Sequence, residues 1–327
     1  MRKAPVADKI RALLRQGLKK TATRWSDEAI GQHFSREVYW LAVPEVMARY
    51  IRKAVGTSRF SAGWMDFLVL EHLRNRLPVR RMASLGCGQG SLERDLARLD
   101  AFQHCDAFDI APGAIATAQR EARAAGFDHI TYSVADLNTL SLDPGAYEAI
   151  WFNGSLHHVD ALEHLLGQVA AALVPDGYLF LNEYVGARRF AFPAPQRDAI
   201  VACNLLIPPR LRKVRHPDGT VAVRETSPLP DPIQVRAADP SEAVRSDEIL
   251  PIVAELFDVV VCNGVGGSIL QFLLQDIAGN FTSDDPEAQG VLDLLFEIED
   301  RLVALGVIPN DFVVLAARPK VPPAQSA

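Results

Sequence analysis

Four titratable side chains stand at points of the sequence where chemistry is expected. His157 and His158 follow the apolar segment 149–152, and Asp109 and Asp136 each follow another apolar segment. An imidazole takes up a proton near neutral pH, whereas a carboxylate at the end of a strand can accept hydrogen bonds from ribose hydroxyls. We therefore expect a nucleoside-type ligand, held by the two acids, beside a histidine base.

A glycine-rich turn comes before these residues. Residues 82–85 form an apolar run, residues 86–90 read Gly-Cys-Gly-Gln-Gly, and leucines three to four positions apart follow over 92–99. This order predicts a buried strand, a turn and a helix. Without a side chain at Gly86 or Gly88, a ligand can lie against the backbone where the strand gives way to the helix.

Apolar strand segments then alternate with segments of helical periodicity. Such alternation predicts a parallel, doubly wound α/β sheet. The helices expected between the strands include 112–124 and 162–173, and residues 175–177, Pro-Asp-Gly, predict a turn before the fifth strand. The expected strands are 82–85, 105–110, 130–138, 149–152, 178–181, 258–262 and 312–316.

Together these motifs resemble the class I S-adenosylmethionine-dependent methyltransferases, specifically bacterial members that act on small molecules or glycans. The resemblance covers residues 80–185 and rests on the glycine turn 85–90, Asp109, the string 135–137 and the string 153–158. It implies a doubly wound, mostly parallel seven-stranded sheet whose last strand is antiparallel. It also implies an N-terminal helical cap, an insertion after strand 5 and S-adenosylmethionine as the methyl donor.

The resemblance also assigns roles by position. It implies that the glycine turn lies under the methionine portion of the donor, that Asp109 holds the ribose, and that Asp136 meets the adenine amino group. Ile110 or Leu137 would lie beside the adenine ring. The donor-binding residues expected on this basis are Gly86, Cys87, Gly88, Gly90, Asp109, Ile110, Asp136, Leu137 and Asn153.

A nicotinamide-dependent dehydrogenase is the main alternative from another class of chemistry. Its fingerprint places the third glycine three positions after the second, at a helix N-terminus near a pyrophosphate. Here Gly90 comes two positions after Gly88, and a methyl donor has no phosphate that needs such an anion site. The spacing favours the methyltransferase. A non-catalytic donor-binding subunit and an enzyme that uses the donor for another reaction stay open.

Methyl transfer from a sulfonium is an in-line displacement, which depends mainly on aligning the acceptor with the donor. For a hydroxyl acceptor we expect a histidine base, either His157 or His158, because two neighbouring side chains do not point equally into one pocket. Glu183 and Tyr184, at the end of the fifth strand, are the second choice. O-methylation is the expected reaction, with N- or C-methylation of a secondary metabolite as the alternative.

The N-terminal part of the chain is expected to cover the donor and the acceptor. Residues 25–77 are rich in aromatic side chains, and His33, Tyr39 and Trp40 are the candidates for the pocket. The basic segment 1–20 has leucines and an isoleucine at helical spacing, which favours a surface helix over a membrane-binding one.

The proline-rich stretch 187–239 suits an insertion near the acceptor site. After it, Ser241 and Ser246 are expected as N-caps, the second of a helix over 248–257. Three polar residues in this region could hold an acceptor, although helix caps and surface ion pairs explain them equally well. They are Asp239, Glu242 and Arg245.

We therefore divide the chain into five segments. They are an N-terminal helical cap (1–79), the donor-binding core (80–186), the insertion near the acceptor site (187–247), the C-terminal completion of the core with a helical insertion (248–318) and a disordered tail (319–327).

The composition fits a globular enzyme of the cytoplasm. The formal net charge of −6 argues against a general nucleic-acid binder, because affinity for a polyanion rests on clustered Lys and Arg. The four cysteines form no CxxC pair, so neither a disulfide framework nor a metal site is expected. No membrane span and no signal peptide are expected. The expected partner is a small-molecule or sugar acceptor, and a homodimer stays open.

Overall fold

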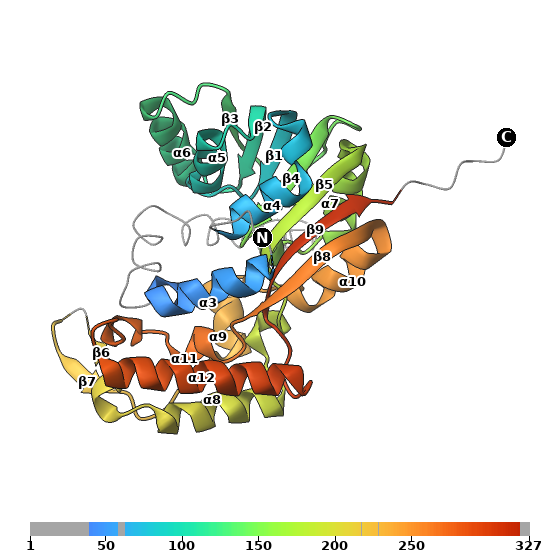
Figure 1. Ribbon diagram of the computed structural model, residues 1–327. Helices are drawn as coiled ribbons and strands as arrows, with labels where there is room; N and C mark the ends of the chain where they lie inside the picture. The colour runs from blue at the N-terminus through green and yellow to red at the C-terminus, as the bar shows by residue number, and fades with distance from the viewer. Residues whose placement is uncertain (1–38, 58–62, 217, 228, 321–327) are drawn as a thin grey trace, which may run out of the picture.

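The computed structural model describes residues 39–57, 63–216, 218–227 and 229–320. A seven-stranded sheet forms its centre, in the order β3-β2-β1-β4-β5-β9-β8 (Figure 1). Strands β1 to β5 pair in parallel, and β9 is antiparallel to both of its neighbours, which confirms the predicted sheet. The strands are β1 (Val79–Leu85), β2 (Phe102–Asp109), β3 (Ile130–Val134), β4 (Tyr147–Asn153), β5 (Leu173–Tyr184), β8 (Phe257–Gly266) and β9 (Phe312–Pro319).

Helices cover both faces of this sheet, because successive residues of each buried strand point to opposite sides. Met82 and Trp151 pack in one apolar cluster with Leu96, whereas their neighbours Ala83 and Ile150 belong to a second cluster. Helices α4 to α6 contribute to the first cluster, and α7 and α10 contribute to the second. These helices are α4 (Trp64–His72), α5 (Ser91–Arg98), α6 (Pro112–Ala124), α7 (Leu162–Ala172) and α10 (Ile249–Leu256).

A further helical layer, here called the cap, lies beyond the carboxyl ends of the parallel strands (Figure 1). It consists of α3 (Pro44–Val55), α8 (Ala194–Leu206), α9 (Pro232–Ala238), α11 (Leu270–Leu273) and α12 (Pro286–Ala304), with a hairpin of β6 (Lys213–Arg215) and β7 (Val221–Val223). Short 3-10 helices join the layers at Trp40–Ala42, Arg74–Arg76, Leu156–His158, Arg188–Phe190, Pro209–Arg212, Ser246–Glu248 and Ala278–Asn280.

Three separate stretches of the chain build the cap. They are α3, the insertion after β5, and the connection between β8 and β9. The expected N-terminal cap is therefore divided, because α4 packs on the sheet through the buried side chains of Phe67 and Leu68. The helix expected over 268–278 is a single turn, α11, whereas the helix expected over 287–305 is α12.

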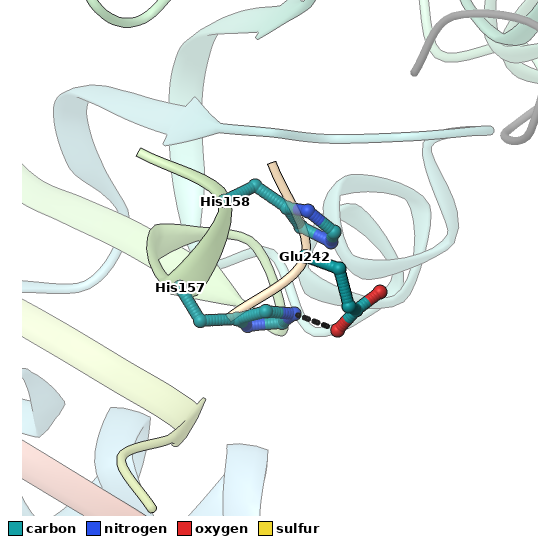
Figure 2. Close-up of side chains that lie close together, drawn as sticks. All are labelled: His157, His158 and Glu242. Carbon is teal, nitrogen blue, oxygen red and sulfur yellow. Dashed lines mark ion pairs between the residues drawn. The ribbon is translucent and has the colours of Figure 1, made fainter. Parts of the chain in front are cut away.

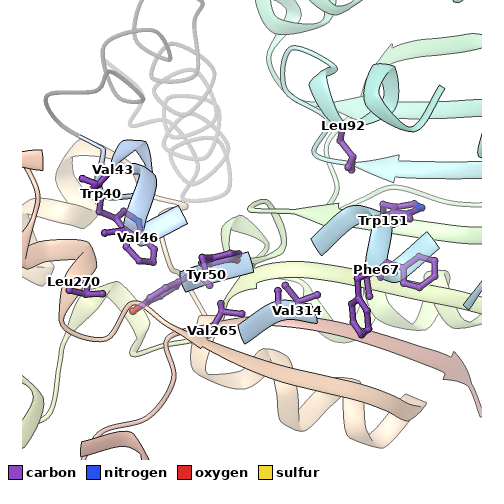
Figure 3. Packing of buried hydrophobic residues seen from close by; sticks show 14 of the residues in the cluster. Trp40, Val43, Val46, Tyr50, Phe67, Leu92, Trp151, Val265, Leu270 and Val314 are labelled. Atoms are coloured by element: carbon purple, nitrogen blue, oxygen red, sulfur yellow. The ribbon is translucent and has the colours of Figure 1, made fainter. Parts of the chain in front are cut away.

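A buried ion pair and a shared apolar core hold the cap together. The guanidinium of Arg49 on α3 lies 2.8 Å from the carboxylate of Glu299 on α12, and the two side chains are 4% and 0% exposed. Glu299 also accepts hydrogen bonds from the backbone of Ile269 at 2.8 Å and Leu270 at 3.3 Å. Figure 3 shows the apolar side chains continuing from the cap to the sheet, where they end at residues such as Trp151.

The turn predicted at 175–177 lies within the bounds of β5. These residues belong to β5, where Tyr147 of β4 faces Leu173 but Ala149 faces Tyr178. The fifth strand therefore carries extra residues in an irregular bulge against the fourth. Proline and glycine are tolerated at such a bulge, so the same residue types that indicate turns are found here inside a strand.

The predicted N-caps are also wrong. The hydroxyl of Ser246 donates to the backbone carbonyl of Gly186 at 2.9 Å, so it ties the segment to the end of β5. Helix α10 begins at Ile249 without a side-chain cap. The hydroxyl of Ser241 donates to the carboxylate of Asp239 at 2.7 Å and does not cap a helix.

Several expectations fall outside the described residues, namely the segment 1–20, His33 and the tail 321–327. The tail predicted from residue 319 begins too early, because β9 continues through Pro319. In the described part of the chain, no helix has the length and apolar character that crossing a membrane requires.

Glu93 gives the fold a pH-dependent stability. Its side chain lies in the first turn of α5, directly after the glycine turn, and is 0% exposed. Burial raises the pKa of Glu93 from 4.5 to about 7. The folded protein therefore binds a proton that the unfolded chain has released, and this contribution to stability is lost as the pH rises from about 4.5 to 7.

We expect the substitution Glu93→Gln to become steadily more favourable relative to the wild type across this pH range. The difference in the free energy of unfolding should change by about 3 kcal/mol between pH 4.5 and pH 8. Urea unfolding at a series of pH values measures it. The exposed Glu255 on α10 gives the control variant Glu255→Gln. A pH-independent difference for Glu93→Gln would contradict the prediction.

Candidate functional site

A cavity of about 520 Å³ opens at the carboxyl ends of the parallel strands. This is the edge where open α/β sheets bind their ligands. Other lining residues come from the cap side and from the segment after β3, among them Tyr39, Tyr50 and Asn138. Eight of the nine expected donor-binding residues line the cavity, namely Gly86, Cys87, Gly88, Asp109, Ile110, Asp136, Leu137 and Asn153.

The glycine turn is shaped by two close approaches. Gly86 has a φ of 78°, and a Cβ atom there would lie 2.3 Å from the Cβ of Ser155, which follows β4. Gly90 has a φ of 76°, and its Cβ would lie 2.5 Å from the hydroxyl of Tyr132. Both conformations favour glycine. Gly90 is not among the residues that line the cavity, so packing of the turn against β3 explains it in this structure.

Asp109 is fixed at the end of β2 by the backbone of the glycine turn. One carboxylate oxygen accepts a hydrogen bond from the amide of Gly88 at 2.9 Å, and the other accepts one from Ala111 at 2.8 Å. Burial raises the pKa of this carboxyl group, and the backbone donors oppose that shift. A carboxylate has about four acceptor positions, so Asp109 can still accept hydrogen bonds from ligand hydroxyls.

Asp136 is held by Asn138, which was expected only as part of the strand 130–138. Oδ1 of Asp136 accepts hydrogen bonds from both the backbone and the side-chain nitrogen of Asn138, each at 2.9 Å. The side-chain oxygen of Asn138 accepts from the amides of Asp160 at 2.9 Å and Ala161 at 3.0 Å, next to α7. The Asp-x-Asn spacing, typical of Asx turns, is the signal that could have identified this residue.

The cap and the sheet meet across the cavity in a chain of polar contacts. The hydroxyl of Tyr50 on α3 donates to the side-chain oxygen of Asn182 on β5. The side-chain nitrogen of Asn182 in turn donates to Asn153 on β4 at 2.8 Å. All three residues line the cavity, as do Tyr39 and Phe312. Trp40, which had been a candidate for the pocket, is 3% exposed and packs in the core.

The two histidines have different surroundings. His158 lines the cavity, whereas His157 is not among the lining residues. Nδ1 of His157 is hydrogen-bonded to the buried carboxylate of Glu183. Oε2 of Glu183 also accepts from the backbone amides of Ser155 at 2.8 Å and Leu156 at 2.7 Å. Glu183 thus fixes the turn that carries both imidazoles.

The pairing of His157 with Glu183 favours the charged form of each side chain. Burial opposes the charge of His157, but the charge of Glu183 and their hydrogen bond outweigh it, so the pKa of His157 is raised. Burial likewise opposes the charge of Glu183, but His157 and the backbone donors lower its pKa. The other second-choice base, Tyr184, donates its hydroxyl to the carbonyl of Ala187 at 3.0 Å. Neither Glu183 nor Tyr184 is among the lining residues.

His158 has a defined tautomer in this arrangement. Its Nδ1 lies 3.0 Å from the hydroxyl oxygen of Ser241, and that hydroxyl donates to Asp239 at 2.7 Å. Because the proton of the hydroxyl is used for Asp239, the oxygen accepts from the Nδ1–H of His158, and Nε2 carries the lone pair. Burial and the positive charge of His157 lower the pKa of His158.

Glu242 completes this part of the site. Its carboxylate lies 3.6 Å from Nε2 of His157, and Figure 2 shows it beside both imidazoles. Arg189 holds the backbone here, donating to the carbonyls of Pro240 at 2.6 Å and Glu242 at 2.9 Å. Arg245, the third polar candidate of this region, instead forms ion pairs on the surface with Glu163 and Glu248.

Comparisons with known proteins support a methyltransferase. Residues 83–177 match the family model described as a methyltransferase domain. The ubiquinone biosynthesis O-methyltransferase of Xanthomonas euvesicatoria is 30% identical over 116 residues, which are 35% of this chain and 47% of that protein. Its counterpart from Burkholderia thailandensis is 26% identical over 106 residues, which are 32% of this chain and 45% of that protein. The chain thus spans less than half the length of these curated relatives.

A solved structure extends the likeness of fold to the cap. The geranyl diphosphate C-methyltransferase of Streptomyces coelicolor A3(2) superposes with a TM-score of 0.52 at 15% identity, over 93% of this chain and 97% of that one. At this identity the likeness concerns the fold alone. The matched domain, the strand order and the glycine turn with its two acids agree: residues 83–177 match a methyltransferase domain, and the chain has the class I methyltransferase fold.

Proposed function

We propose that this protein transfers a methyl group from S-adenosylmethionine to a hydroxyl of a small-molecule or sugar acceptor. The observation that carries the proposal is the single cavity that His158 shares with eight expected donor-binding residues. Its volume of about 520 Å³ falls within the range of small-molecule sites. A donor methyl and an acceptor hydroxyl can therefore meet in one cavity.

The donor half of the cavity suits S-adenosylmethionine. Asp109 can accept from the ribose hydroxyls and Asp136 from the adenine amino group, while the turn at Gly86 and Gly88 leaves backbone free for the methionine portion. Arg94 also lines the cavity and supplies a cation for a carboxylate. These features support the donor without any contribution from the acceptor side.

The acceptor half combines aromatic and apolar surfaces with a few polar groups. The aromatic and apolar surfaces belong to Tyr39, Leu41 and Phe312, and the polar groups belong to Ser241 and His158. This combination favours an acceptor with an apolar part and a hydroxyl. The names of the ubiquinone biosynthesis O-methyltransferases support oxygen as the attacking atom. Carbon is the alternative, since an enzyme of the same fold is named a C-methyltransferase.

In the proposed reaction the acceptor oxygen attacks the methyl carbon in line with the sulfur. The C–S bond breaks, the C–O bond forms, and the hydroxyl proton passes to Nε2 of His158. S-adenosylhomocysteine leaves as the neutral thioether. His157 stays in its ion pair with Glu183 and keeps the turn in place. Alignment in a dry cavity would supply most of the acceleration, with a smaller part from the base.

We expect Asp109→Ala to weaken the binding of S-adenosylhomocysteine by roughly 1–3 kcal/mol, because ribose hydroxyls would lose a charged acceptor. Isothermal titration calorimetry measures this loss. The exposed Asp95 on α5 provides the control variant Asp95→Ala, which should bind like the wild type. Unchanged affinity in Asp109→Ala would remove Asp109 from the ribose site. Tighter binding of a nicotinamide dinucleotide than of the methyl donor would overturn the proposed function.

The second expectation concerns His158. His158→Gln should lower the turnover number at least about a hundredfold, the low end for the loss of a general base, and should leave donor affinity nearly unchanged. Release of S-adenosylhomocysteine with a panel of hydroxylated small molecules measures turnover. The exposed His164 on α7 gives the control His164→Gln. A turnover number close to that of the wild type in His158→Gln would rule out His158 as the general base. Donor binding without turnover on any acceptor would favour a non-catalytic subunit.

A further inference from the structure

Two imidazoles and a carboxylate converge beside the cavity. One ligand atom each from His157, His158 and Glu242 lies within 4.8 Å of the other two. Figure 2 shows the three side chains facing a common space, although Glu242 comes from a distant part of the chain. Histidine nitrogens and a carboxylate oxygen are the donor set of many catalytic zinc sites.

The hydrogen bonds behind the imidazoles prepare both of them as ligands. A histidine that binds a metal through one ring nitrogen nearly always donates a hydrogen bond from the other. Here Nδ1 of His157 is held by Glu183, and Nδ1 of His158 is held by Ser241, which is bonded to Asp239. Both rings are therefore oriented to present Nε2.

The carboxylate of the group is held just as firmly. The amide of Val244 donates to the backbone carbonyl of His157 at 3.1 Å, so the segment that carries Glu242 is joined to the histidine turn. Arg189 secures the same segment from the other side, through the carbonyls of Pro240 and Glu242. The side chain of Glu242 is 19% exposed, which leaves a path for an ion to enter.

We propose that Nε2 of His157, Nε2 of His158 and the carboxylate of Glu242 bind a divalent transition metal ion, with Zn²⁺ as the best match. Three protein ligands leave a fourth position open, as in catalytic zinc sites. His158 also lines the cavity, so the proposed ion would lie beside the acceptor half. Nε2 of His157 and the carboxylate of Glu242 already lie 3.6 Å apart.

This inference deepens the proposed function and rests on it only for the role of the ion. A hydroxyl that coordinates Zn²⁺ becomes more acidic. With the ion bound, His158 is a ligand, and the acceptor hydroxyl would lose its proton to solvent water before it attacks the donor methyl. Without the ion, His158 is the base. No metal site was expected, because the cysteines show no metal-binding spacing and Glu242 is distant from the histidines in the sequence.

The test uses the full chain, free of any histidine tag and stripped with a chelator. Titration with Zn²⁺ followed by calorimetry should give one ion per chain, and Co²⁺ should give the visible absorption of a low-symmetry nitrogen and oxygen site. Glu242→Gln should bind Zn²⁺ at least about tenfold more weakly, as should Ser241→Ala, which removes a support behind His158. The controls Glu255→Gln and His164→Gln, both at exposed positions, should bind like the wild type.

Three outcomes would overturn the site. They are the absence of stoichiometric Zn²⁺ binding, equal affinity in Glu242→Gln and the wild type, or equal losses in the controls. Circular dichroism verifies that each variant is folded, and Ser241→Ala serves if Glu242→Gln is not. Titration of the same samples with S-adenosylhomocysteine separates the two proposals. If the wild type does not bind S-adenosylhomocysteine, the result counts against the proposed function. If the wild type binds S-adenosylhomocysteine but not Zn²⁺, the result counts against the metal site alone.

Discussion

Both halves of the site depend on one buried carboxylate. Glu183 is 0% exposed and accepts hydrogen bonds from the backbone of Ser155 and Leu156 as well as from His157. Ser155 lies against Gly86, and its hydroxyl donates to the carbonyl of Leu85 at 2.6 Å, so the donor side is connected to this charge. His157 connects it to the acceptor side. Removing one partner of such a buried charge is strongly destabilising, because it leaves the charge uncompensated.

The cap depends on a second buried charge. The pair of Arg49 and Glu299 joins α3 to α12, and Glu299 also holds the backbone that leads into α11. Elements from two ends of the chain are thereby brought to the same edge of the sheet. This arrangement explains how Tyr50 reaches Asn182 across the cavity, although 132 positions separate them.

The donor side could be predicted from the sequence because its determinants are local. A strand, a glycine turn and a helix follow one another directly, and Asp109 and Asp136 come just after the next two strands. The acceptor side could not be predicted in the same way. Ser241 and Glu242 lie close to the histidines only after the sheet, the insertion and α10 have packed together.

Glu183 illustrates a second limit of sequence reading. Its position at the end of β5 was recognised, but its role depends on the side to which it points. Side chains alternate along a strand, so Asn182 reaches the cavity and Glu183 turns to the opposite side beneath the histidine turn. Two neighbouring positions of β5 therefore have different roles: Asn182 lines the cavity, and Glu183 holds the histidine turn. Hydrophobic pattern alone does not decide it where both faces of a strand are buried.

The places where the cap joins the core bear on how such proteins diverge. The insertions enter after β5 and between β8 and β9, while the expected donor contacts lie at the ends of β1 to β4. A new cap could therefore be exchanged onto the same sheet without rebuilding the donor pocket. The exchange would succeed only if the incoming segments still packed on α3, whose Tyr50 contacts Asn182, and supplied a carboxylate in place of Glu242 beside His157. The range of acceptors can thus change when whole cap segments are exchanged, provided that the few residues at their junctions with the core change with them.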